Sequence, residues 1–241
     1  MKNSKYWIIG LAIVIAAALV GRAYTYKYRS QQTIVVTGLG ETEFSSDKIV
    51  WTATLTAEAE TAAAGYAKVE QNKRKVQEYL LSKGIPAEAV IFEFVNAEKQ
   101  FTTIYQDGKW AGQRFAGYEL RQRFTVESKE VEKVEVVSRE ISSLIAQGVA
   151  IEAYAPDYYY TKLDDVKMGL IETASADARL RAEKIASNAG AKLGAVKSAR
   201  MGVFQITGAN SNEEFSAGGS FNTSSRQKKA RITMRIEYRV N

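Results

Sequence analysis

The 241-residue chain contains no cysteine and no histidine. These two side chains supply most nucleophilic, acid–base and metal-binding chemistry near neutral pH, so their absence removes the commonest catalytic and metal sites. Without cysteine, the chain can neither form a disulfide nor carry the acylated cysteine of a lipoprotein. Catalysis through serine with lysine, or through paired carboxylates, stays open, but no such pattern here is diagnostic. We therefore expect no enzyme activity, no cofactor and no bound metal.

Acidic residues are absent from the first thirty positions, which hold five bases. Residues 31–241 hold 28 bases and 27 acids, so nearly all of the net charge of +6 comes from the N-terminal segment. A nearly neutral remainder releases few counterions on contact with a phosphate backbone. Arg231, Arg235 and Arg239 share one face of a predicted strand, but Tyr238 lies on the other face, whereas single-strand platforms combine bases and aromatics on one face. We expect no nucleic-acid partner and interpret the arginine face as solvated or facing another subunit.

Only one long apolar run occurs, at residues 7–21 (WIIGLAIVIAAALVG). Its fifteen residues fall short of the about 20 that cross a bilayer core, although aromatic neighbours can extend it. We predict that residues 1–30 form an uncleaved, single-pass signal anchor in the inner membrane, with residues 31–241 on the periplasmic side. A cleaved signal peptide is the alternative, and the flanking charges do not fix the orientation. The residues predicted to contact lipid are Trp7, Ile8, Leu11, Ile13, Ile15 and Leu19.

After residue 30, the apolar pattern alternates between a period of two and a period of about 3.6, which predicts an α+β fold. We expect mixed or antiparallel sheets, three main helices and a long projecting β-hairpin. The predicted helices cover about 61–82, 130–147 and 163–189, and the predicted strands begin at 34 and cover about 49–58, 89–106, 110–127, 149–155, 195–206 and 228–240. A helix followed by two strands occurs after residue 61 and again after residue 163. The domain of residues 31–241 can therefore consist of two βαββ-like halves, about 31–128 and 129–241.

The longest two predicted strands meet at Asp107-Gly108, a strong signal for a type I′ hairpin turn. Each strand is about three times the usual length of five or six residues, so part of the hairpin should project. Aromatic side chains gather in this hairpin and after Pro156, and aromatics in projecting segments are enriched at protein interfaces. We predict a homo-oligomer interface there, the alternative being that the rings pack on their own domain. The candidate interface residues are Phe101, Tyr105, Trp110, Tyr158, Tyr159 and Tyr160.

Small residues mark two other segments. Gly38 and Gly40 follow the first predicted strand, and because no helix opens after them they do not form a dinucleotide-binding loop; we interpret them as a bulge or tight turn. Ala174, Ala178 and Ala182 recur at helical spacing. This stripe predicts a helix that lies close to a sheet.

Three segments resemble one known family. They are Gly38-Leu39-Gly40, Lys83-Gly84-Ile85 and, above all, residues 174–194 (ASADARLRAEKIASNAGAKLG). Together they resemble the SIMPL-domain family of bacterial periplasmic proteins of unknown function, whose best-known type is the periplasmic immunogenic protein. The resemblance covers about residues 33–240. It implies an α+β fold, a periplasmic location, large ring-like or channel-like homo-oligomers and an association with envelope and oxidative stress, and it supplies no agreed catalytic residues.

The predicted function follows from the anchor, the poor catalytic inventory and the aromatic hairpin. We expect a membrane-anchored periplasmic protein that assembles with copies of itself and has a structural or envelope-stress role without catalysis. The alternative is a small-molecule or lipid-binding module enclosed by the oligomer. A serine or carboxylate hydrolase is a third possibility.

Overall fold

The computed structural model describes residues 4–29, 32–214 and 216–240. The helices of this part of the chain are α1 (Ser4–Arg29), α2 (Ala62–Ser82), α3 (Val131–Glu140) and α4 (Leu163–Asn188), with short 3-10 helices η1 (Ala87–Ala89) and η2 (Ile141–Gln147). The strands are β1 (Thr33–Ser45), β2 (Lys48–Ala59), β3 (Val90–Gln106), β4 (Lys109–Ser128), β5 (Ala150–Ala153), β6 (Asp157–Tyr159), β7 (Leu193–Met201), β8 (Gln205–Gly208) and β9 (Gln227–Val240). All pairings between these strands are antiparallel, which confirms the predicted α+β class.

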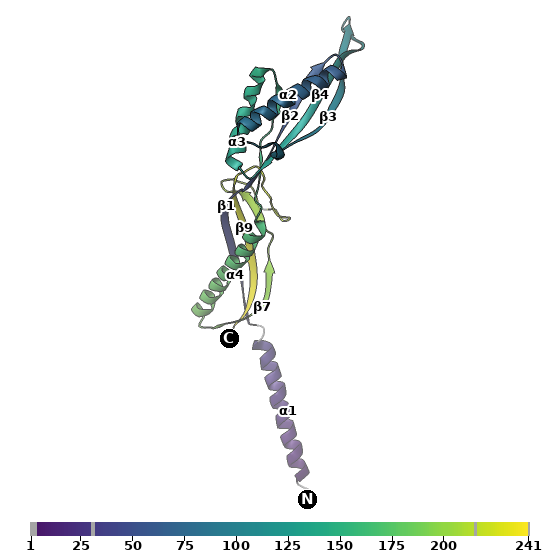
Figure 1. The fold of residues 1–241 in the computed structure, drawn as a ribbon. Helices are drawn as coiled ribbons and strands as arrows, with labels where there is room; N and C mark the ends of the chain where they lie inside the picture. Colours follow the sequence, from purple (N-terminus) through teal and green to yellow (C-terminus); the bar gives the residue numbers. More distant parts are fainter. Residues whose placement is uncertain (1–3, 30–31, 215, 241) are drawn as a thin grey trace.

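The strands form two sheets. Sheet A has the order β1-β9-β7, with β8 also pairing with β9, and sheet B has the order β3-β4-β2-β5, with β6 also pairing with β2. The chain passes from sheet A to sheet B through Ser46 and Asp47, between β1 and β2. Figure 1 shows the resulting elongated molecule, in which sheet A lies between α1 and sheet B, and the tip of the β3-β4 hairpin lies at the far end.

Each sheet is built around one β-α-β-β unit. In sheet B the unit is β2-α2-β3-β4, and in sheet A it is β1, then α4, β7 and β9. The strand order is the same in both units, because the first strand pairs with the last and the middle strand lies outside the last. The helix-strand-strand pattern seen after residues 61 and 163 is therefore present in both sheets. The sheets nevertheless divide the chain differently from the halves 31–128 and 129–241, because β1 pairs along its whole length with β9.

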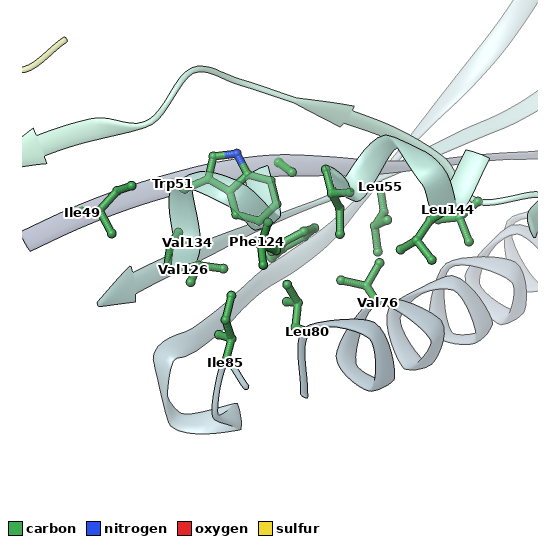
Figure 2. Close-up of a cluster of buried hydrophobic side chains, with 14 of the residues drawn as sticks. Ile49, Trp51, Leu55, Val76, Leu80, Ile85, Phe124, Val126, Val134 and Leu144 are labelled. Carbon is green, nitrogen blue, oxygen red and sulfur yellow. The ribbon is translucent and has the colours of Figure 1, made fainter. Parts of the chain in front are cut away.

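Large side chains fill the core of sheet B (Figure 2). Alternating apolar residues of β2 point to one face, where Trp51 meets Phe124 edge-on, with the ring centroids 5.7 Å apart. The indole nitrogen of Trp51 donates to the carbonyl oxygen of Tyr154 at 3.0 Å, so this buried polar group is satisfied. Helices α2 and α3 close the core with Val76, Leu80, Val134 and Val137.

Small residues make the core of sheet A close-packed. Strand β1 pairs continuously with β9 from Thr33 to Ser45, so the interpretation of Gly38 and Gly40 as a bulge or turn is wrong. Both glycines face α4: a Cβ on Gly38 would lie 2.5 Å from the backbone nitrogen of Ala178 and closer still to the carbonyl oxygen of Ala174. The alanine stripe is buried as predicted, with Leu170, Ala174, Ala178, Ala182 and Ala186 facing the sheet.

Two predicted elements are interrupted. The strand expected at 195–206 divides into β7 and β8, because the three residues 202–204 lie opposite only two residues of β9, and the extra residue breaks the ladder. The helix expected at 130–147 tightens into the 3-10 helix η2 after Glu140 and ends at Gly148, whose φ of 78° places it in the left-handed region.

Candidate functional site

The hairpin formed by β3 and β4 turns at Asp107 and Gly108, whose φ angles of 50° and 72° fit the type I′ turn that the sequence predicts. Its aromatic residues form cross-strand pairs: Phe101 lies opposite Phe115, and Tyr105 lies opposite Trp110. The rings of Phe101 and Phe115 meet edge-on with centroids 6.0 Å apart. Four aromatic residues that are separate in the sequence thus form one row through strand pairing.

The aromatic row is open to solvent. Tyr105 is 68% exposed, Trp110 is 69% exposed, and Phe101 and Phe115 are each at least two-fifths exposed. We call these four residues the hairpin patch. Aromatic side chains carry roughly 150–250 Å² of surface each, so the patch exposes on the order of 500 Å², at the upper end of what a monomeric protein usually exposes.

Three of the six predicted interface residues, Phe101, Tyr105 and Trp110, lie in the hairpin patch. Phe115 was missed, because simple alternation places it on the face opposite Trp110 and only the extra residue near Gly112 brings it into the row. The three tyrosines lie elsewhere, in and just after β6, which pairs with β2.

The tyrosines after Pro156 pack on their own domain. Tyr158 is only 7% exposed and belongs to the core of sheet B, and its burial, with a smaller effect of Glu135, raises the pKa of its hydroxyl. The ring of Tyr160 lies against Phe44 of β1, with centroids 4.7 Å apart. The structure thus separates these residues from the hairpin and places them where the two sheets join.

An open groove of about 430 Å³ crosses the face of sheet B opposite the core. A bulge shapes it, because Glu93 and Phe94 of β3 together lie opposite the single residue Arg123 of β4. The buried Gln122 holds the bulge by donating to the carbonyl oxygen of Glu93 at 2.8 Å. Phe94 is therefore 82% exposed at the rim of the groove.

Charges of both signs line this groove. Arg121 pairs with Glu119 at 2.7 Å, and Glu119 also accepts a hydrogen bond from Gln100 at 2.8 Å. Arg123 and Glu152 add one further charge of each sign. Such a lining suits a polar or zwitterionic partner better than a purely apolar ligand.

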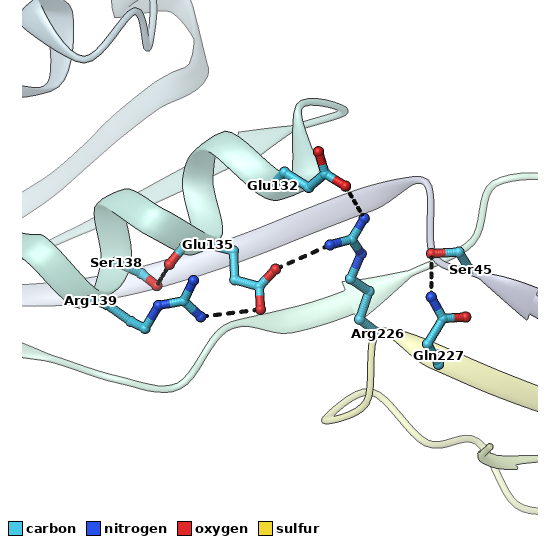
Figure 3. Close-up of polar contacts among 7 residues, drawn as sticks. All are labelled: Ser45, Glu132, Glu135, Ser138, Arg139, Arg226 and Gln227. Atoms are coloured by element: carbon cyan, nitrogen blue, oxygen red, sulfur yellow. Dashed lines mark hydrogen bonds and ion pairs between the residues drawn. The ribbon is translucent and has the colours of Figure 1, made fainter. Parts of the chain in front are cut away.

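An arginine links the two sheets where β1 passes into β2 (Figure 3). Arg226, just before β9, forms ion pairs with Glu132 at 2.6 Å and Glu135 at 3.4 Å. Both acids lie on α3, which packs on sheet B. Beside it, the Gln227 amide donates to the Ser45 hydroxyl at 3.3 Å. The two ion pairs connect sheet A to the helix on sheet B, whereas the Gln227–Ser45 bond lies within sheet A.

The predicted membrane-contacting residues lie on α1. Trp7, Leu11, Ile13, Ile15 and Leu19 are all exposed, whereas the side chain of Ile8, and residues 1–3 and 30 of the predicted anchor, lie outside what the structure describes.

Within the described residues, none of the helices combines the length and the hydrophobicity needed to cross a membrane. The prediction of a transmembrane helix therefore lacks support.

In residues 4–29, 32–214 and 216–240, no group of three or more acidic side chains is arranged to hold a metal ion.

A model of the family described as "SIMPL: Protein of unknown function (DUF541)" matches residues 34–240. The chain belongs to the SIMPL family. The match runs from β1 to β9 and so includes both sheets and the hairpin, and the resemblance seen in the sequence is confirmed. No curated protein matches the chain. The description of the SIMPL family names no activity.

Proposed function

We propose that this SIMPL protein is a membrane-attached periplasmic protein that assembles with copies of itself through the hairpin patch, in a structural or envelope-stress role without catalysis. The observation that carries the proposal is the row of exposed aromatic pairs on the hairpin. Aromatic rings bury much surface at little cost in side-chain entropy, which makes them frequent anchors of protein interfaces.

The area of the patch is consistent with a specific contact. Two patches of on the order of 500 Å² would together bury about 1,000 Å², near the lower limit of stable interfaces. Strand β3 is also the edge strand of sheet B over its 17 residues. An exposed edge strand readily pairs with another chain, so pairing along β3 can add backbone hydrogen bonds to the aromatic contact.

Membrane attachment rests on α1. This helix presents large apolar side chains to solvent on every side, including Trp7, Ile9 and Ile15. Burying such a surface in lipid is favourable by about 25 cal/mol for each Å². The proposal requires insertion of α1 into lipid, and flotation of the full chain with vesicles tests it.

The assembly is tested with the full chain in detergent, by light scattering after size exclusion. We expect the wild-type chain to give a large discrete mass and the double variant Tyr105→Ala/Trp110→Ala to give a smaller one. The matched control is Tyr66→Ala, because Tyr66 is also exposed but lies on α2. A monomeric wild type, or a double variant of unchanged mass, contradicts the proposal.

A second candidate is a binding module for a small molecule or lipid, favoured by the groove beside Phe94. Native mass spectrometry of the purified chain tests it: a bound molecule that Phe94→Ala releases supports it, and a chain without bound mass argues against it.

A further inference from the structure

Two arginines lie directly opposite each other on the uncovered face of sheet A. Arg200 of β7 pairs in register with Arg235 of β9, and Thr37 of β1 is the other neighbour of Arg235. Opposed residues on adjacent antiparallel strands have their Cβ atoms only about 5 Å apart, and like charges at such positions destabilise a sheet. The pair therefore costs stability in the free protein.

Among the described residues, no acidic side chain forms an ion pair with either arginine. In the part of the chain that the structure describes, neither Arg200 nor Arg235 has a hydrogen-bond or ion-pair partner. The nearby Glu237 is engaged by Lys197 at 3.0 Å and by the Ser198 hydroxyl at 3.1 Å, and the Lys197 contact lowers the pKa of its carboxyl. Two positive charges thus remain available at one place.

The two arginines line a common hollow. It measures about 240 Å³ and is also lined by Val35, Ser198 and Glu237. A guanidinium offers a planar fork of donors that binds oxyanions through two hydrogen bonds. A phosphate group carries a charge of about −2 and three terminal oxygens, so it can satisfy both forks and both charges, whereas a carboxylate would leave one charge over.

We propose that the hollow between Arg200 and Arg235 binds a phosphate-type dianion, carried either by a water-soluble phosphate or by a lipid headgroup. The apolar Val35 at the same hollow offers contact to the carbon part of a phosphate ester. Sheet A is the sheet nearest α1 along the chain, since β1 begins at Thr33 and α1 ends at Arg29. Thr37, beside Arg235, lies about 14 Å along β1 from Thr33. A lipid headgroup near the end of α1 and a phosphate in solution are therefore both considered as the source of the anion.

The test uses the full chain in nanodiscs of phosphatidylcholine, with inorganic phosphate as the probe and sodium chloride at equal ionic strength as the reference. We expect saturable phosphate binding that weakens about tenfold or more in Arg200→Gln and in Arg235→Gln. Arg74→Gln is the matched control, because Arg74 is an exposed arginine on α2. Absence of saturable binding by the wild type, or unchanged binding by Arg200→Gln, overturns the proposal.

Thermal unfolding separates a binding role from a structural one. If the pair exists to bind an anion, phosphate raises the melting temperature of the wild type only, and Arg200→Gln melts higher than the wild type when phosphate is absent, because the repulsion is gone. A lower melting temperature for Arg200→Gln without phosphate contradicts this account.

A second set of nanodiscs, containing phosphatidic acid, identifies the source of the anion. If the headgroup of the protein's own membrane reaches the hollow, inorganic phosphate binds the wild type more weakly in these discs than in phosphatidylcholine discs. If binding is equal in both, the ligand is a water-soluble phosphate.

Discussion

Replacing Gly38 by alanine should destabilise sheet A strongly, because β1 and α4 are in backbone contact at this position. The added Cβ would lie 2.5 Å from the backbone nitrogen of Ala178 and closer still to the carbonyl oxygen of Ala174. Non-bonded heavy atoms prefer separations of about 3.5–4.0 Å, so α4 would have to move away by more than about 1 Å. Overpacking of this kind costs about 1–3 kcal/mol, and the rigid backbone on both sides places Gly38→Ala near 3 kcal/mol.

The matched control is Gly169→Ala, in α4 itself. A Cβ at Gly169 meets nothing within 4 Å, and alanine favours a helix over glycine by about 1 kcal/mol, so this variant should be more stable than the wild type. Urea unfolding of the full chain, followed by circular dichroism, measures both changes. Ala178→Gly should not rescue Gly38→Ala, since the closest clash is with a carbonyl oxygen. A Gly38→Ala chain as stable as the wild type would refute the close-packing argument.

Two further predictions concern charges. Arg226→Gln should lower the free energy of unfolding by about 1 kcal/mol in dilute buffer and by less at about 1 M salt, because its ion pairs with α3 are partly exposed and screened; urea unfolding at the two salt concentrations measures this. Asp177 has a lowered pKa, caused first by Arg181 and then by the backbone N–H of Leu39, so its contribution is present above the ordinary carboxyl pKa and is lost as the pH falls through the lowered value. Asp177→Asn should therefore be less stable than the wild type at neutral pH and equal to it in strong acid, and a difference that persists in acid would contradict the assignment.

The periodic patterns predicted most of the secondary structure. Strand β9 alternates buried and exposed residues from Lys228 to Tyr238, and α4 buries every fourth residue from Leu170 to Ala186. In both elements one face meets a sheet or helix and the other meets water, so the side-chain period is visible in the chain itself. The Asp107-Gly108 turn was predictable for a similar reason, since only the local backbone decides it.

Strand partners were not predictable in the same way. Strands β1 and β2 follow each other with only two residues between them, yet they belong to different sheets. The role of Gly38 depends on α4, and the neighbouring Leu39 N–H bonds to Asp177, 138 residues away. A local pattern shows that a glycine is present, but the element that approaches it comes from a distant part of the chain.

The candidate surfaces depended on bulges that alternation does not reveal. Counting back from the turn places Phe101 opposite Arg114, but an extra residue near Gly112, whose φ is 123°, moves Phe115 into that position. A second bulge exposes Phe94. One extra residue reverses which face the following side chains occupy, so the aromatic row could be located only approximately.

The two sheets pack against their helices in different ways. Sheet A holds α4 through backbone contact, whereas sheet B holds its helices through large side chains such as Trp51. Strands β1 and β2 together span 27 residues, on the order of 80 Å when extended, between the end of α1 and the hairpin. Arg226 connects the start of β9 to α3, which packs on sheet B, so we expect its ion pairs to limit bending between the sheets. If copies assemble through their hairpins as proposed, Arg226→Gln should broaden the mass distribution of the assembly without removing its aromatic contacts, and light scattering after size exclusion measures this.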